Sequence, residues 1–96
     1  MQFSWDSDKD ESNQVKHGLS FETAKKVFDD PFHSSTQDRY VEGEARWKTI
    51  GMVGGVVLLL VAHTWTDDGE DEQVVRIISA RRANAHERKR YEDENS

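Results

Sequence analysis

The 96-residue sequence contains no cysteine, and its one proline is Pro31. Without cysteine the chain has no disulfide bond, no thiolate-bound zinc and no thiol nucleophile. Its four histidines are scattered and follow none of the spacings of zinc sites, so we expect no metal and no other cofactor. The Gly54-Gly55 pair lacks the Lys-Ser/Thr partner of a phosphate-binding loop. These absences leave metal-dependent hydrolysis, P-loop nucleotide binding and thiol chemistry without support.

Long hydrophobic runs are also missing. The longest apolar run, from Met52 to Ala62, is interrupted by two glycines and is too short to cross a bilayer. The N-terminal residues show no basic stretch followed by an apolar one, so no secretory signal is visible. We therefore expect no membrane association and take the cytoplasm as the default compartment. The length fits one domain, residues 1–91, with residues 92–96 as a frayed acidic tail.

Charge is distributed unevenly. The whole chain has a formal charge of −6, but residues 76–91 hold six bases and one acid, a charge of +5. Positive charge that is segregated in this way is a candidate surface for phosphate groups. Basic exits from a strand into a helix also occur in ordinary domains, and on this pattern alone that is the commoner explanation.

The chain reads as two helices, a meander of strands and a last helix. Helices are expected over residues 7–16, from Ser20 to Pro31, and from Asn84 to about Tyr91, where Asn84 and Glu87 form a capping box. Strands are expected over residues 44–52, 56–66 and 73–80, with a short strand or loop at 31–43. The predicted fold class is α+β: an antiparallel sheet of three to four strands, preceded by two helices and followed by one.

Lys16 and His17 end the first predicted helix, directly before Gly18. The commoner explanation is structural, because cations complement the dipole at a helix C-terminus and glycine is the usual stop. The alternative is functional: this corner presents His17 as an acid or base and Lys16 as an anion contact.

Glu44, Arg46 and Lys48 alternate along one predicted strand and so share one face. A solvated sheet face is the commoner explanation, whereas a carboxylate beside a guanidinium also suits a general base next to an oxyanion-stabilising group. We expect His63, at the end of the apolar strand, to be a structural residue. The acid-rich residues 67–72 lack the spacing of a calcium loop and are expected to form a solvated turn.

The order of these residues resembles the BrnT family of bacterial toxins over approximately residues 3–91. The matching pieces of the first half are Phe3-x-Trp5-Asp6, Lys9, Asn13, Lys16-His17-Gly18, Phe21, Ala24 and Val27-Phe28-Asp29-Asp30-Pro31. Those of the second half are Gly43-Glu44-x-Arg46, Ile50-Gly51, His63-Thr64, Arg76-Ile77-Ile78-Ser79-Ala80-Arg81-x-Ala83, Glu87 and Tyr91. The combination of Lys-His-Gly with Arg-Ile-Ile-Ser-Ala-Arg in one small protein is the specific part of the pattern.

The resemblance implies a fold similar to that of RelE-like toxins and a ribonuclease toxin of a type II toxin–antitoxin pair. It implies metal-independent cleavage of RNA, and an antitoxin partner of the BrnA kind that binds DNA, so that DNA is contacted only through the complex. A non-catalytic interaction module, or an inactive relative that only binds its partner, is the alternative.

Site residues follow from the same resemblance. It places Arg46 and Arg81 at the scissile phosphate, with Lys16 assisting, and makes Glu44 and His17 the acid–base candidates. Further substrate contacts are expected at the following positions: Arg76, Arg82 and Tyr91. For Arg76 an ion pair on the sheet face is the favoured alternative to a phosphate contact.

Overall fold

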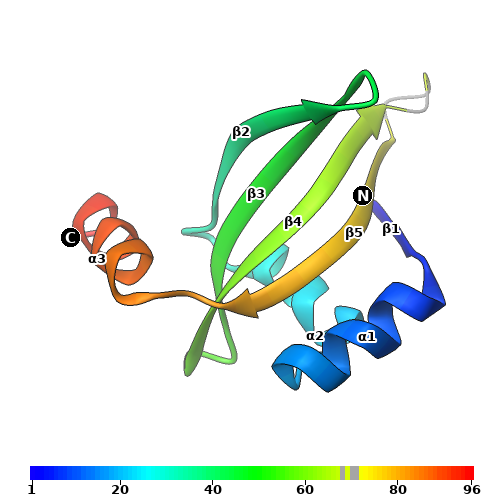
Figure 1. The fold of residues 1–96 in the computed structure, drawn as a ribbon. Helices are drawn as coiled ribbons and strands as arrows, with labels where there is room; N and C mark the ends of the chain where they lie inside the picture. The colour runs from blue at the N-terminus through cyan, green and yellow to red at the C-terminus, as the bar shows by residue number, and fades with distance from the viewer. Residues whose placement is uncertain (68, 70–71) are drawn as a thin grey trace.

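The computed structural model describes residues 1–67, 69 and 72–96, and shows a five-stranded sheet with helices on one face and at one end (Figure 1). The strand order is β1-β5-β4-β3-β2. The strands are β1 (Gln2–Trp5), β2 (Ser34–Val41), β3 (Glu44–Val53), β4 (Val57–Asp67) and β5 (Gln73–Arg82). The helical elements are α1 (Ser7–His17), α2 (Phe21–Ala24), the 3-10 helix η1 (Lys25–Asp29) and α3 (Ala85–Glu94). Part of the acid-rich turn predicted at 67–72 lies outside the described residues.

The predicted α+β class is confirmed, but two details of the predicted sheet are wrong. It has five strands rather than three to four, and it is not purely antiparallel, because β1 precedes α1 and pairs parallel to β5. In this register Phe3 lies opposite Val75 and Trp5 opposite Ile77. The four residues of β1 alternate in burial, as a strand requires, but their partner strand lies at the other end of the sequence. A segment this short gives no local sign of such a pairing.

Three element boundaries also differ from the expected ones. The segment left open as strand or loop forms the edge strand β2, which pairs antiparallel with β3. The second helix is a single α-helical turn that continues as η1 up to Asp29. The last helix continues to Glu94, so three of the five residues expected to form a frayed tail are helical.

The hydrophobic core lies between one face of the sheet and the segment from α1 to η1. Its buried members are Leu19, Phe21, Ala24, Val27, Leu59, Val61, Val75, Ile77 and Ala80. A close approach at Gly51 lets η1 reach the sheet, since a Cβ atom there would lie 2.6 Å from the backbone oxygen of Val27. We call this face of the sheet the core face.

The opposite face of the sheet, which we call the open face, carries polar side chains along most of β3 and apolar ones, Ile50 and Leu60, near α3. Alternation along β3 puts Thr49 and Gly51, both buried, on the core face and Glu44, Arg46 and Lys48 on the open face. This division of β3 matches the sequence prediction. Helix α3 stands beside the end of the sheet at which β5 terminates, apart from α1 and α2 (Figure 1).

Candidate functional site

A carboxylate lies between two guanidinium groups on the open face. Glu44 on β3 accepts a 2.6 Å hydrogen bond from Nη2 of Arg76 on β5, and Nη2 of Arg46 lies 4.0 Å from the same carboxylate oxygen. We call these three residues the Glu44 cluster. The ion pair that the sequence favoured for Arg76 is therefore present. Among the described residues, Nε of Arg46 is a buried donor without a hydrogen-bond partner.

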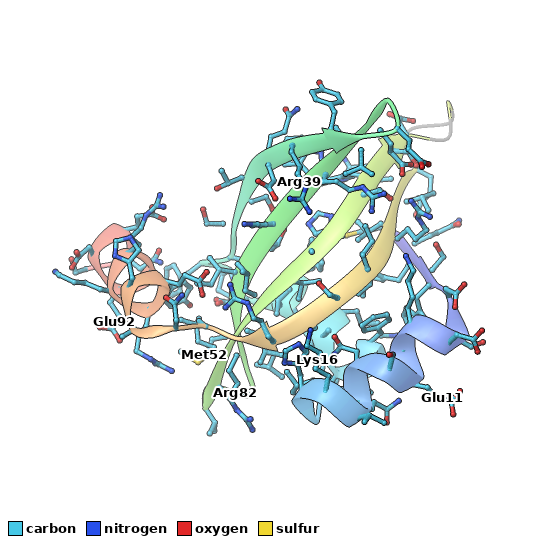
Figure 2. The ribbon with its side chains drawn as sticks, viewed as in Figure 1. Glu11, Lys16, Arg39, Met52, Arg82 and Glu92 are labelled. Carbon is cyan, nitrogen blue, oxygen red and sulfur yellow. The ribbon has the colours of Figure 1, made fainter. Side chains whose placement is uncertain are left out.

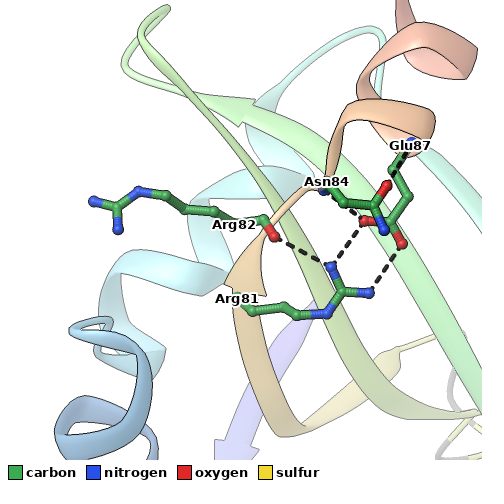
Figure 3. A network of polar contacts seen from close by, with 4 residues as sticks. All are labelled: Arg81, Arg82, Asn84 and Glu87. Carbon is green, nitrogen blue, oxygen red and sulfur yellow. Dashed lines mark hydrogen bonds and ion pairs between the residues drawn. The ribbon is translucent and has the colours of Figure 1, made fainter.

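A second cluster lies where β5 leads into α3 (Figure 3). Arg81 donates to Glu87 from both terminal nitrogens of its guanidinium group, Nη1 to Oε1 at 2.8 Å and Nη2 to Oε2 at 2.9 Å. Glu87 also accepts from the backbone N–H of Asn84 and completes the predicted capping box. The hydrogen bonds of this pair raise the pKa of Arg81 and lower that of Glu87. A phosphate that approaches Arg81 therefore competes with Glu87 for the same planar fork of donors.

The two clusters lie on one face but at different levels. Arg81 is in register with Leu60, which pairs with Ile50, whereas Arg46 is four residues earlier than Ile50 on β3. Four residues of strand correspond to about 13 Å. Lys48 lies between these levels and forms a 3.6 Å ion pair with Asp38 on β2. The open face thus carries a row of cations, each with a carboxylate nearby.

The remaining predicted cations do not lie on the open face. Lys16 is exposed and His17 is half-buried at the end of α1, which packs on the core face. Arg82 follows the buried Ala80 by two residues and points away from Arg81, as Figure 3 shows. Figure 2 shows Lys16 and Arg82 at the same end of the molecule. The structure therefore places four predicted residues on the open face, in two separate clusters, and three on the helical side of β5.

Tyr91 is 8% exposed, and its hydroxyl is held in the interior. It donates a 2.5 Å hydrogen bond to Oδ2 of Asp30, which also accepts from the backbone N–H of Met52, while Oδ1 accepts from the backbone N–H of Phe32. Burial alone raises the pKa of Asp30, but these hydrogen bonds outweigh it and the pKa is lowered. Burial, and then Asp30, raise the pKa of Tyr91 to about 12.

His63 is fully buried, beside the rings of Phe28 and Trp65. Its Nδ1 lies 2.9 Å from the carbonyl oxygen of Thr64, and its Nε2 lies 2.7 Å from the hydroxyl of Thr49. Because a carbonyl only accepts, Nδ1 carries the proton and Nε2 accepts from Thr49. Desolvation lowers the pKa of His63, which favours this neutral form. The structural role predicted for His63 agrees with this network.

Comparison with known proteins decides the family. The model of the family described as "Ribonuclease toxin, BrnT, of type II toxin-antitoxin system" matches residues 5–87. The chain belongs to the BrnT family. Among solved structures, it is similar to the 1.1 Å crystal structure of the Brucella abortus ribonuclease toxin BrnT. That match has a TM-score of 0.61 and 24% identity, and it covers 88% of this chain and 97% of the other. No curated protein matches.

The members of this family are described as ribonuclease toxins of type II toxin–antitoxin systems. A toxin of such a system implies an antitoxin partner. Within the described ranges of this BrnT-family chain, no group of three or more His, Asp or Glu residues is arranged to hold a metal ion. The same residues include no helix with the length and apolar character needed to span a membrane.

The basic helix of this BrnT-family chain is less positive than residues 76–91 suggest. Its three bases each face an acid four residues later, in the pairs Arg88–Glu92, Lys89–Asp93 and Arg90–Glu94. Residues 76–94 together hold six bases and four acids, a formal charge of +2. Sequence reasoning missed this neutralisation of the bases by the acids, because the helix was expected to end near Tyr91, before Glu92, Asp93 and Glu94.

Sequence reasoning also missed two polar anchors, Asp30 and Asn13. Asn13 is 6% exposed and bonds both the N–H and the carbonyl of Ala80, at 3.1 and 3.0 Å, and the carbonyl of Leu19 at 2.9 Å. A single asparagine thus ties α1 to β5. Both anchors belong to the pieces that match the family pattern, and that was their only sign in the sequence.

Proposed function

We propose that this chain is a metal-independent endoribonuclease whose RNA substrate binds across the open face of the sheet. The observation that carries the proposal is the arrangement on that face. The Arg81 fork and the Glu44 cluster lie on one surface, with Lys48 between them, in a chain of the BrnT family. Rigid strands hold all of these groups, which favours preorganised stabilisation of a charged transition state.

The chemistry of such cleavage requires three groups. A base takes the proton of the 2′-hydroxyl, cations stabilise the pentavalent phosphate, and the departing 5′-oxygen takes a proton, which we assign to solvent water at the exposed face. Arg46 and Arg81 suit the phosphate, since each guanidinium donates two parallel hydrogen bonds. Their levels on the face differ by about 13 Å, so their long side chains must leave the carboxylates and extend toward each other to reach one phosphate. We assign the base role to Glu44, because it shares a face with these arginines and lies next to Arg46 and Arg76.

The remaining predicted residues receive supporting roles. Lys16, His17 and Arg82 lie on the helical side of β5, where they contact RNA that continues past the edge of the sheet. Arg76 positions Glu44 through their 2.6 Å contact and becomes available to a phosphate when that contact opens. Tyr91 contributes its ring rather than its hydroxyl, which Asp30 holds.

The proposed partner is a DNA-binding antitoxin of the BrnA kind that covers the open face. Such a partner blocks RNA from the arginines, and it supplies the only contact of the complex with DNA. This part of the proposal follows from the family and from the position of the cations on one uncovered face.

Expression of the chain alone, beside Arg81→Ala, tests the proposal. Wild type is expected to arrest growth and degrade RNA, and the purified variant to cleave RNA about 10²–10³-fold more slowly, as after loss of one oxyanion donor. Arg39→Ala is the matched control, because Arg39 is an exposed arginine with no ion pair among the described residues. Folding of each variant is checked by circular dichroism.

A soluble, folded Arg81→Ala variant with wild-type activity would remove Arg81 from the site. The alternative function is an inactive toxin relative that only binds its partner, and the carboxylates beside Arg76 and Arg81 favour it, because they compete with phosphate. Soluble wild-type protein that neither arrests growth nor cleaves RNA, but binds the antitoxin, would establish that alternative.

A further inference from the structure

We propose that a groove between α3 and the strands β2 and β3 binds one nucleobase of the RNA, next to the phosphate that Arg81 holds. This inference rests on the proposed function, because it adds a base subsite to the same open face. The groove has a volume of about 240 Å³. It would give the protein a contact that depends on the base, where the arginines contact only the backbone.

Its lining combines apolar surface with polar edges. Ile50 of β3, Leu60 of β4 and Tyr91 of α3 supply the apolar surface, and Ser34 and Thr36 of β2 supply hydroxyl groups. Register explains why they converge. Ser34 pairs with Ile50 and Ile50 with Leu60, so these side chains form one row across the open face. A nucleobase matches this lining, because its faces are apolar and its edge forms hydrogen bonds.

The groove is continuous with the arginine that is proposed to hold the phosphate. Leu60 is the register partner of Arg81, so the apolar row leads directly to that arginine. Glu87 lines the groove and also binds the Arg81 fork at 2.8 and 2.9 Å. A phosphate that takes the place of Glu87 on Arg81 therefore brings its own nucleotide to the mouth of the groove.

The charges around the groove favour a neutral occupant. Lys48 is paired with Asp38 and Arg90 with Glu94, at 3.6 and 3.8 Å. Because these cations already have carboxylate partners, a charged ligand gains little from them. A neutral base replaces its hydrogen bonds to water by hydrogen bonds to the polar lining, and its faces pack against the apolar lining. The volume holds a single planar group of this kind and is far too small for a helix of a partner.

Binding of short, non-cleavable RNA tests the subsite. Trinucleotides with 2′-O-methyl groups, which lack the attacking hydroxyl, are compared with the same molecules that lack the base at one position in turn. For wild-type protein we expect the trinucleotide that lacks the base at one particular position to bind about 10-fold more weakly than the intact one, within the range measured for single base contacts. The methyl NMR signals of Ile50 and Leu60 should shift with the intact molecule and not with that abasic one.

A variant that fills the groove provides a second test of the base subsite. Thr36→Phe should bind the intact and abasic trinucleotides equally, because the ring occupies the groove. Thr66→Phe is the matched control: Thr66 is an exposed threonine at the other end of the sheet, outside the groove, and this variant should keep the base dependence. Thermal unfolding confirms that both variants fold.

The outcomes separate the base subsite from the nuclease function. Equal affinity of wild type for all intact and abasic trinucleotides, or no binding of any of them, overturns the subsite, whether or not unmodified RNA is cleaved. Base-dependent binding with Ile50 and Leu60 shifts supports the subsite even if cleavage is absent, and in that case the nuclease proposal alone fails.

Discussion

The hydroxyl of Tyr91 donates a 2.5 Å hydrogen bond to Asp30, across 61 residues of sequence. The same carboxylate oxygen accepts a 2.7 Å hydrogen bond from the backbone N–H of Met52 on β3. One buried carboxylate therefore joins the end of η1, strand β3 and helix α3. The position of α3, and with it the wall of the groove, depends on this contact.

Removal of that hydroxyl is expected to destabilise the protein while leaving the ring in place. Tyr91→Phe should lower the free energy of unfolding by about 1–3 kcal/mol, because a buried charged acceptor loses one of its donors. Urea denaturation measures the effect. Tyr40→Phe is the control, since Tyr40 is 67% exposed, and it should change stability little. An equal effect of the two substitutions would contradict the anchoring role.

Buried His63 should make stability fall as the pH is lowered below neutrality. Its pKa in the folded chain is lower than the ordinary 6.5, so the unfolded chain binds a proton first and stability decreases as the pH falls through about 6.5. Urea denaturation between pH 7.5 and 5 measures this slope. His63→Gln should flatten it, whereas His86→Gln, at an exposed position of α3, should leave it as in wild type. An unchanged slope in His63→Gln would contradict the assignment.

Asn13 is expected to contribute more to stability than any exposed residue of α1. Asn13→Ala removes three hydrogen bonds to the backbone and leaves the buried N–H of Ala80 without its partner. A loss of about 2–4 kcal/mol is expected from net values near 1 kcal/mol per bond and the cost of the unsatisfied group. Gln14→Ala, at an exposed neighbour, is the control. Chemical denaturation that ranked the two variants alike would contradict this account of how α1 is held.

The acids of α3 are expected to weaken RNA binding by neutralising the helix. A variant in which Glu92, Asp93 and Glu94 become Gln, Asn and Gln frees three bases and should bind single-stranded RNA more tightly, with a steeper dependence on salt. The control carries the same change of net charge at exposed acids that form no ion pair within the described part of the chain: Asp8→Asn, Glu11→Gln and Glu42→Gln. If both variants gain affinity equally, net charge rather than α3 is responsible.

Local features of the fold were predictable, because each rests on neighbours in sequence. Gly18 ends α1 with a φ of 69°, and Asn84 forms its capping box with Glu87, both as the sequence indicated. Alternation along β3 likewise placed Glu44 and Arg46 on one face. These signals lie within a few residues of one another, so periodicity and capping chemistry are sufficient to find them.

What was missed depends on residues far apart in sequence. The pairing of β1 with β5 and the anchor between Asp30 and Tyr91 have no local pattern. For the same reason the sequence did not reveal which side of the sheet α1 covers. That choice separates Lys16 and His17 from the arginines of the open face, although all of them belong to one family pattern.

The parallel pairing of β1 with β5 has a consequence for synthesis. The ribosome makes Phe3 and Trp5 well before their strand partners, Val75 and Ile77. A nascent chain without β5 lacks part of the core and also Arg76 and Arg81. Closure of the core therefore waits for translation of β5, and contacts this distant in sequence form slowly. Chains that are abandoned before β5 is made lack these two arginines, so under the proposed function they would not cleave RNA.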